Sequence, residues 1–193
     1  MPYFNIVAQT TENTVVTEYE PAKTRSSNYQ SEAALEKEFI HMLTEQGYEY
    51  LKIHHEKDLI ANLRTQLEKL NDYHFTENEW ERFFKDSIAN QNEGIVEKTR
   101  TIQEDNIKNL KRDDGSTKNI TIIDKKNTHN NFLQVINQYV IGTAEGAKHD
   151  NRYDVTILVN GLPLVHVELK RRGVAIREAF NQINRYQRDS IRL

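Results

Sequence analysis

The stretch from Arg152 to Lys170, RYDVTILVNGLPLVHVELK, decides the fold. On both sides of Asn160-Gly161, a dipeptide typical of tight hairpin turns, apolar and polar residues alternate with the period of two of a half-buried β-strand. The apolar face would carry Val155, Ile157, Val159, Val165, Val167 and Leu169. The opposite face would carry Asp154, Thr156, His166, Glu168 and Lys170. Charged side chains gathered on one sheet face are costly without partners, so this hairpin is the first place to expect chemistry.

The register of this hairpin can be tested on its residue pattern. A plain two-residue turn at Asn160-Gly161 would place the Asp154 carboxylate opposite Val167, which is an acid against the core. A shift of one residue pairs Val155 with Val167 and, at the same time, Asp154 with Glu168. We therefore expect a three-residue loop or a β-bulge near the turn, which Pro163 favours because it has no N–H to donate to the ladder.

The shifted register brings two carboxylates face to face. Opposed residues in an antiparallel pair have Cβ atoms roughly 5 Å apart, so Asp154 and Glu168 would repel each other unless a cation lay between them. Two carboxylates with open water positions suit Mg²⁺, a hard ion that keeps much of its hydration shell. Lys170 points to the same side, where an ammonium group can orient an attacking water and offset charge on a phosphate. The pattern predicts metal-dependent phosphodiester hydrolysis, with Asp154 and Glu168 as metal ligands and Lys170 as a catalytic residue.

The rest of the chain predicts helices before and after this hairpin. Ser31 and Gly47 have the residue types of a helix N-cap and C-terminal stop, and Thr76 begins a capping box. The expected elements, in chain order, are a short strand or arm and loop over 1–30, helices over 31–46 and 56–71, a helix from 76, a helical stretch to about 105, a hairpin over 107–123, a strand over 132–141 and a helix over 174–190. This order predicts an α/β fold in which helices flank a central mixed sheet.

Composition narrows the class of protein. The chain has 193 residues, a net charge of −3, and no cysteine, which excludes disulfides and thiolate metal sites and favours a cytoplasmic setting. It contains no apolar run of the ~18 residues that a membrane span needs, and its first residues lack a signal-peptide pattern. The charge is uneven, because residues 170–193 carry +5 and the remainder −8. A basic segment of this kind suits contact with a polyanion, although a solvated helix face has the same pattern.

The order of these residues resembles a known nuclease signature. Asp154 followed by Glu168-Leu169-Lys170 on consecutive strands resembles the PD-(D/E)xK motif, and Gln182-Ile183-Asn184-Arg185-Tyr186 resembles the QxxxY motif of its RecB-like branch. The segments 31–51 (SEAALEKEFIHMLTEQGYEYL) and 152–190 are similar to the N-terminal nuclease region of R subunits of type I restriction–modification enzymes. The resemblance implies a restriction-endonuclease-like fold, and it covers 31–53 and about 150–190 well.

The resemblance implies a role for each matching residue. Asp154 and Glu168 would hold Mg²⁺, with the Leu169 carbonyl as a possible third ligand, and Lys170 would be the catalytic lysine. Gln182 and Tyr186, one turn apart on a helix, would contact the DNA backbone, although the same spacing suits a helix face resting on the sheet. The sequence departs from the motif at Tyr153, where the signature has proline.

An acid on the first helix joins the site in some related nucleases. Glu32 and Glu36 share a helix face and are both candidates, with a slight preference for Glu36.

The resemblance also implies a domain plan and partners. Residues 1–30 would form an N-terminal arm and 31–193 an endonuclease domain with a helical insertion at 54–105. The chain would be part of a longer polypeptide with a C-terminal ATP-dependent translocase, since the phosphate-binding pattern G-x-x-x-x-G-K-S/T does not occur in it. The substrate would be double-stranded DNA, and the partners would be the specificity and methyltransferase subunits. Together these features imply a type I site-specific deoxyribonuclease.

Other interpretations of single features stay open. The same fold could grip DNA or a partner without cutting, and the helices of 56–105 could form an interaction domain. Asp124-Lys125-Lys126 imitates the end of the signature, but its lysines fall in a polar run. Trp80, Phe83 and Phe84 at helical spacing indicate a core rather than a base-stacking surface.

Overall fold

The structure is a computed structural model that describes residues 3–9, 15–20, 31–141, 151–171 and 174–190. At its centre lies a four-stranded sheet with the order β3-β6-β7-β8. The strands are β3 (Glu49–Tyr50), β6 (Leu133–Ile141), β7 (Asn151–Val159) and β8 (Leu162–Val167). β3 runs parallel to β6, and the other neighbours are antiparallel, so the predicted mixed sheet is confirmed.

The β7–β8 hairpin has the register that the alternating pattern requires. Val155 pairs with Val167, and Ile157 pairs with Val165. The turn itself has two residues, Asn160 and Gly161, with φ of 51° and 82°. Positive φ at both central residues is typical of a type I′ turn, whose twist matches that of the two flanking strands. The register shift lies near the start of β8, because Leu158 pairs with Pro163 whereas Ile157 pairs with Val165. The predicted bulge is therefore confirmed, and the alternative of a three-residue loop is wrong.

Helix α1 (Glu32–Glu45) covers one face of this sheet. The Ser31 hydroxyl accepts the Ala34 N–H at 3.2 Å, and Gly47 follows the helix with φ of 92°, as expected. Leu43 packs on Val135 and Val155 of the central strands, with Phe39 and Ile40 beside it. Since α1 is anchored on the strand that carries Asp154, acids in its first turns lie near that strand.

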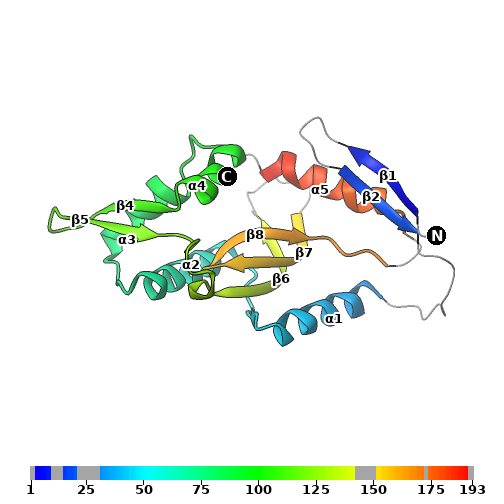
Figure 1. Cartoon of the computed structure of the whole chain (residues 1–193), viewed down its shortest axis with the longest axis horizontal. Helices are drawn as coiled ribbons and strands as arrows, with labels where there is room; N and C mark the ends of the chain where they lie inside the picture. The colour runs from blue at the N-terminus through cyan, green and yellow to red at the C-terminus, as the bar shows by residue number, and fades with distance from the viewer. Residues whose placement is uncertain (1–2, 10–14, 21–30, 142–150, 172–173, 191–193) are drawn as a thin grey trace.

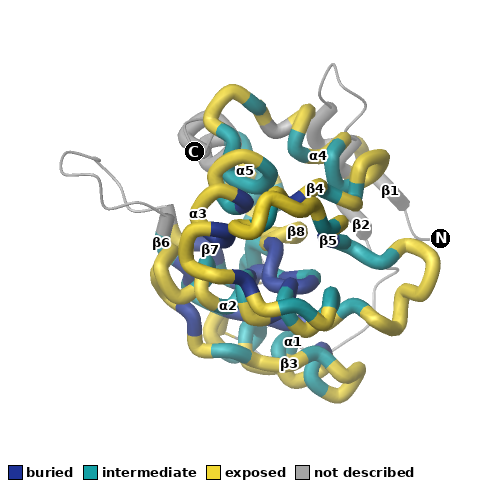
Figure 2. Tube along the Cα trace, turned by 90° about the vertical axis from the view of Figure 1, so that its left-hand side faces the viewer, coloured by how far each residue is buried: buried dark blue, intermediate teal, exposed yellow. Residues whose placement is uncertain are grey.

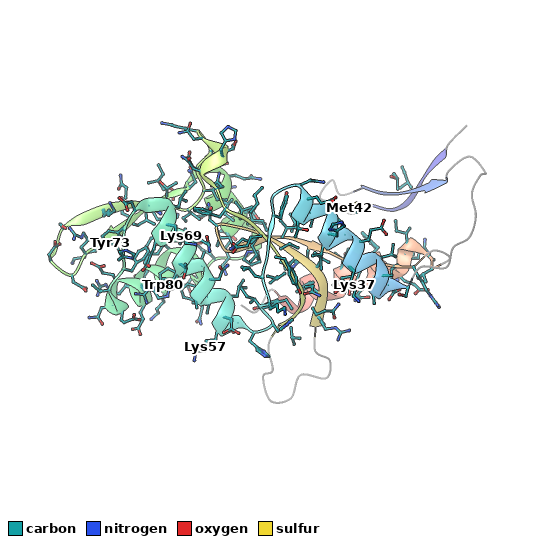
Figure 3. The ribbon with its side chains drawn as sticks, turned by 90° about the horizontal axis from the view of Figure 1, so that it is seen from below. Lys37, Met42, Lys57, Lys69, Tyr73 and Trp80 are labelled. Atoms are coloured by element: carbon teal, nitrogen blue, oxygen red, sulfur yellow. The ribbon has the colours of Figure 1, made fainter. Side chains whose placement is uncertain are left out.

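A second core lies at the far end of the sheet and belongs to residues 56–123. It contains α2 (Glu56–Asn71), α3 (Glu77–Phe83), a π-helical turn η1 (Phe84–Ile88), α4 (Ile95–Glu104) and the hairpin β4–β5 (Ile107–Lys111, Thr117–Thr121). Trp80 and Phe83 are buried there against Leu63 and Leu67 of α2, as predicted from their helical spacing. In Figure 2 the buried residues, in dark blue, lie in the interior of the molecule. In Figure 3, Tyr73 and Trp80 lie at the opposite end of the molecule from Lys37 and Met42 of α1.

This second core meets the hairpin turn of the central sheet at Gly161. A Cβ placed on Gly161 would lie 2.6 Å from the Cα atom of Leu63, so only glycine allows α2 to approach the turn so closely. Leu162 then enters the second core directly. The two parts of the molecule are thus joined at the end of β7 that lies farthest from Asp154.

The N-terminal residues form a hairpin rather than a single strand with loop. β1 (Tyr3–Gln9) pairs antiparallel with β2 (Val15–Glu20), and β1 lies against the last helix, α5 (Ile176–Ser190). The β-branched run Val15-Val16-Thr17 accounts for the second strand. In Figure 1, α5 and α1 lie on opposite sides of the central strands. None of the helices in the described ranges combines the length and apolar character that crossing a bilayer requires.

Candidate active site

The site forms where β7 and β8 leave the ladder. Val155 and Val167 are the final pair; Asp154 precedes Val155 in β7, and Glu168 comes directly after β8, which ends at Val167 and not at Lys170 as expected. The Leu169 N–H donates to Asp154 Oδ2 at 2.8 Å, so the carboxylate of one strand holds the backbone of the other. The structure thus brings together the two acids that the register analysis paired.

Glu168 is buried in this arrangement, with its side chain only 3% exposed. The Lys170 ammonium donates to Glu168 Oε1. Glu168 Oε2 is buried too, and no hydrogen-bond donor reaches it from the residues that the structure describes. Burial and then the neighbouring Asp154 carboxylate raise the pKa of Glu168, against the opposing effect of the Lys170 hydrogen bond. A carboxylate in this state gains stability from any cation that reaches its second oxygen.

The environment of Lys170 keeps the amine charged. Burial opposes the charge, but the hydrogen bond to Glu168 and the charges of Glu168, Asp154 and Glu32 outweigh it and raise the pKa of Lys170. An ammonium group is a hydrogen-bond donor without acceptor capacity. Lys170 can therefore donate to a phosphate oxygen or a water, and it cannot act as a base in this state.

The donor set fits a hard divalent ion that keeps water ligands. Asp154 and Glu168 supply carboxylate oxygens, and the buried Oε2 of Glu168 is an acceptor that lacks a donor among the described residues. Within those same residues, Asp, Glu and His side chains do not assemble into a cluster of three that could enclose a metal ion. Two carboxylates with a backbone carbonyl suit Mg²⁺, which is usually held by one or two carboxylates and several waters.

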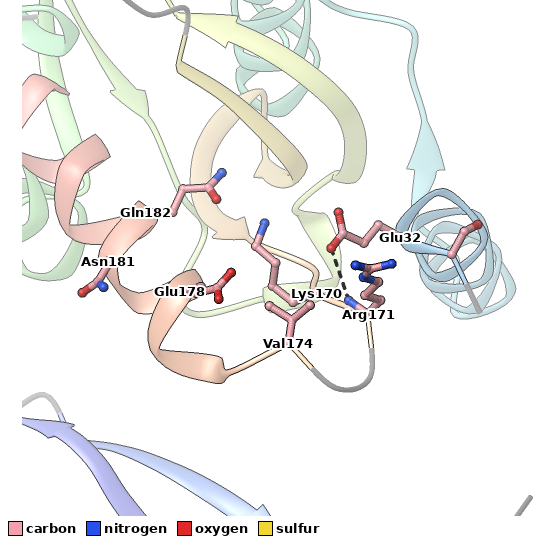
Figure 4. Close-up of a pocket in the computed structure, with 8 residues that line it drawn as sticks. Glu32, Lys170, Arg171, Val174, Glu178, Asn181 and Gln182 are labelled. Atoms are coloured by element: carbon pink, nitrogen blue, oxygen red, sulfur yellow. Dashed lines mark hydrogen bonds between the residues drawn. The ribbon is translucent and has the colours of Figure 1, made fainter. Parts of the chain in front are cut away.

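A cavity of about 660 Å³ opens beside Lys170 (Figure 4). It is lined by residues of the α1 N-terminus, the segment after β8 and one face of α5: Ser31, Glu32, Lys170, Arg171, Val174, Glu178, Asn181 and Gln182. In Figure 4 the Lys170 amine lies between the Glu32 and Gln182 side chains. The cavity is large enough for a small part of a substrate beside Lys170, whose amine donates to Glu168; Asp154 and Glu168 are not among its lining residues.

The two acids of α1 have different surroundings. Glu32 lies at the cavity, where its Oε1 is 3.4 Å from the Arg171 N–H and its charge acts on Lys170. Glu36 binds two amides of β6 instead: its Oε1 accepts from Asn137 Nδ2 at 2.5 Å, and its Oε2 accepts from Gln138 Nε2. The slight preference for Glu36 is therefore not supported by the contacts, which bring Glu32 to the side of Lys170.

The QxxxY pair is described in part. Gln182 lines the cavity on α5, one helical turn after Glu178. Tyr186 belongs to the same helix, but its side chain lies outside the described part of the structure. Contact of either residue with DNA stays a prediction.

His166 has a more defined environment than the sequence indicated. Its ring stacks on Tyr153, with the centroids 3.9 Å apart and the planes 13° from parallel, and its Nδ1 lies 2.9 Å from Thr156 Oγ1. Desolvation by burial lowers the pKa of His166 to about 4. The imidazole is therefore neutral near pH 7.

Asp124, the acid of the imitation motif, holds a loop together. Its Oδ1 accepts the N–H groups of Lys126 and Asn127 at 3.0 and 2.9 Å, and its Oδ2 accepts from Asn130 Nδ2 at 2.8 Å. These bonds lower the pKa of Asp124. The side chain has a structural partner for each oxygen, which agrees with the interpretation of this motif as unrelated to the site.

A mixed sheet flanked by helices, with two acids and a lysine at the end of its last hairpin, defines a restriction-endonuclease-like α/β domain. Within that class the chain belongs to the family described as type I restriction enzyme R protein N terminus, whose model matches residues 29–192.

Relatives of known name agree with this family. The chain is 46% identical over 185 residues to the type I restriction enzyme EcoprrI endonuclease subunit of Escherichia coli, covering 95% of this chain and 58% of that protein. It is 41% identical over 167 residues to the SsaAORF53P endonuclease subunit of Staphylococcus saprophyticus and the SauMSSORF170P endonuclease subunit of Staphylococcus aureus. Those matches cover 84% of this chain and 17% of each relative.

Proposed function

We propose that this chain is a Mg²⁺-dependent endonuclease that hydrolyses DNA phosphodiester bonds as the cleavage domain of a type I restriction–modification enzyme. The observation that carries the proposal is the buried Glu168 carboxylate, which lies beside Asp154, is paired with Lys170 on one oxygen and offers its other oxygen to a cation. Membership of a restriction-enzyme family, with relatives named as endonuclease subunits, supports the same activity.

In this proposal Asp154 and Glu168 hold Mg²⁺, with the Leu169 carbonyl as a third ligand. The bound ion would polarise the phosphate and lower the pKa of a water molecule. The Lys170 ammonium, already charged, would orient the attacking water and offset the charge that develops on the phosphate oxygens. Attack of the water oxygen on phosphorus would break the bond to one ester oxygen of the backbone; the attacking water would give its proton to solvent, and the departing oxygen would take a proton from solvent.

The remaining surroundings would bind and orient the DNA. Gln182 lines the cavity next to Lys170, and in this proposal its amide would donate to a phosphate oxygen, with Tyr186 acting one turn later on α5. The +5 charge of residues 170–193 would attract double-stranded DNA. The specificity and methyltransferase subunits would select the target, ATP would serve a translocase in the full-length protein, and the enzyme would work in the cytoplasm.

A plasmid-cleavage assay tests the proposal. The chain, alone and assembled with specificity and methyltransferase subunits, is incubated with supercoiled DNA and Mg²⁺. Lys170→Ala and Asp154→Ala should each lower the cleavage rate by at least ~10²-fold, because each removes charge stabilisation at the reacting phosphate. Lys126→Ala, which changes the lysine at the matching position of the Asp124-Lys125-Lys126 motif, is the matched control and should cleave like the unchanged chain.

Calorimetry separates the possible failures. Asp154→Ala should abolish Mg²⁺ binding, whereas Lys170→Ala should preserve it. Mg²⁺ binding that does not depend on Asp154 contradicts the assignment of the ligands. DNA binding without cleavage in the assembled complex would identify the chain as a binding module that does not cut.

A further inference from the structure

The ladder between β6 and β7 is interrupted opposite Asp154. The pairs on either side keep one register: Asn137 with Val155, and Tyr139 with Tyr153. Gln138 and Asp154, which that register would oppose, do not form a pair in the ladder. Gln138 has φ of 54°, a left-handed conformation that a residue with a side chain rarely adopts inside a strand. The left-handed conformation of Gln138 therefore requires contacts that stabilise it.

The interruption changes which face the strands present. In a regular strand, residues two apart point to the same face. Val155 packs in the cluster under α1, whereas Tyr153 packs in the cluster on the other face, with Leu158. On β6, Val135 and Tyr139 are divided between the same two clusters. Because the switch occurs at Asp154 and Gln138, the conformation of this one step sets the direction of the Asp154 carboxylate.

Glu36 of α1 binds both residues on the β6 side of the switch. Its two carboxylate oxygens accept separately from the Asn137 and Gln138 side-chain amides. The Tyr50 hydroxyl donates to Asn137 Oδ1 at 2.8 Å and extends the chain of bonds to β3. Hydrogen bonds to an ionised acceptor are stronger than neutral ones. This carboxylate thus ties the irregular step of β6 to a helix that is itself packed on Val155.

We propose that Glu36 is a positioning residue that holds Gln138 in its left-handed conformation and thereby sets the direction of the Asp154 carboxylate. The proposal rests on the proposed function, since Asp154 is the metal ligand whose direction matters. It gives the two acids of α1 separate tasks. Glu32 lies beside Lys170 at the cavity, and Glu36 supports β6, the strand next to the one that carries Asp154. Glu36 acts through β6 and is not itself a ligand.

Glu36→Gln is the first test, because glutamine keeps the shape but can accept only one of the two amides. Supporting groups of a metal site change affinity by ~10–100-fold when mutated, so Mg²⁺ affinity measured by calorimetry should fall about tenfold. The Leu169 amide, which donates to Asp154 in the metal-free chain, should exchange its hydrogen faster by NMR. Glu45→Gln, an exposed glutamate of the same helix paired with His41, is the matched control and should change neither value.

Substitution of Gln138 distinguishes a positioning role from a ligand role. Glycine adopts positive φ without a side-chain penalty. Gln138→Gly combined with Glu36→Gln should therefore recover most of the lost Mg²⁺ affinity and the slow exchange at Leu169. Gln138→Val, in which a β-branched residue opposes the left-handed conformation, should weaken Mg²⁺ binding although Glu36 is intact. This last variant keeps the test usable if Glu36→Gln does not fold.

Two results would overturn the proposal. The first is unchanged Mg²⁺ affinity and unchanged Leu169 exchange in both Glu36→Gln and Gln138→Val. The second is a loss in Glu36→Gln that glycine at 138 does not relieve, which would make Glu36 a ligand. If Mg²⁺ binding does not depend on Asp154 in the otherwise unchanged chain, the proposed function fails instead, and Leu169 exchange still reports whether Glu36 positions Asp154.

Discussion

Two glutamates with buried side chains, one in the second core and one at the end of the central hairpin, have opposite environments. Glu79 lies at the start of α3 beside the second core, where hydrogen-bond donors reach both of its carboxylate oxygens. Glu168 lies at the end of the central hairpin, where its Oε2 accepts from none of the described residues. The contrast separates a charge that is buried to stabilise the fold from a charge that is buried at a site.

Glu79 is fully engaged by its own surroundings. It accepts from the Thr76 N–H at 3.1 Å, the Tyr73 hydroxyl at 2.8 Å and the Asp113 N–H at 3.0 Å. Burial alone would raise the pKa of Glu79, but these bonds outweigh it and lower the pKa. The carboxylate closes the capping box of α3 and ties that helix to the tip of the β4–β5 hairpin. Its role is complete without a ligand.

Among the described residues, Lys170 is the single donor to Glu168 and bonds one of its oxygens, and the Asp154 carboxylate is close by. Its pKa is raised, so the ionised form is less stable in the fold than in water. A protein gains no stability from such an arrangement, which persists where another molecule completes it. The direction of the pKa shift, more than burial itself, is the reason we propose Glu168 and not Glu79 as the functional glutamate.

The largest expected effect of this difference is on catalysis. Glu168→Gln should lower Mg²⁺-dependent cleavage by ~10³-fold. In the proposed function the bound metal stabilises the transition state by several kcal/mol, and this change would remove one of its carboxylate ligands. In EDTA the same change should raise the free energy of unfolding at pH 7, because the raised pKa of Glu168 means that the fold disfavours its ionised form. Cleavage assays and urea titrations in EDTA check the two halves. Lower stability together with normal cleavage would reverse the roles of the two glutamates.

Glu79→Gln should have the opposite profile. Its expected effect is a loss of about 2–3 kcal/mol in the free energy of unfolding, because a buried acceptor would face donors that it can no longer satisfy. Mg²⁺ affinity should stay within about twofold of the unchanged chain, since additivity holds for sites that share no partners. Urea titration and calorimetry on one preparation measure both. A tenfold change in Mg²⁺ affinity would mean that the second core contributes to the site.

Much of this contrast could be predicted from the sequence. The hairpin register followed from the apolar and acidic patterns, because both required the same shift and a bulge could absorb it. The caps at Ser31 and Thr76 followed from residue types at fixed spacings. Such features depend on neighbours close in the chain, which a sequence displays directly. The proximity of Asp154 to Glu168 was predictable for the same reason, although the ladder ends one step before them, at Val155 and Val167.

Other features depend on contacts between distant segments and have no local signal. Nothing in the residues around Gln138 indicates a left-handed step, since its holder, Glu36, lies about a hundred residues earlier. Glu32 and Glu36 share a helix face, so spacing alone could not assign one to the cavity and the other to β6. β3 is two residues long and is defined only by its pairing with β6, which no periodicity can display.

The smallest expected effect is on the pH dependence of stability, where the two glutamates should act on opposite sides of pH 4.5, the usual pKa of the side chain. A raised pKa means that the folded chain holds the proton more tightly, so the contribution of Glu168 is fully present below pH 4.5 and is lost as pH rises through the raised value. The lowered pKa of Glu79 gives the reverse: its contribution is present above pH 4.5 and is lost as pH falls through the lowered value. Urea titrations in EDTA from pH 3 upward, on the unchanged chain and on each glutamine variant, give each contribution as a difference in free energy of unfolding. Two differences that slope in the same direction would show that the metal-free fold treats both carboxylates alike, and the argument that Glu168 awaits a cation would lose its physical basis.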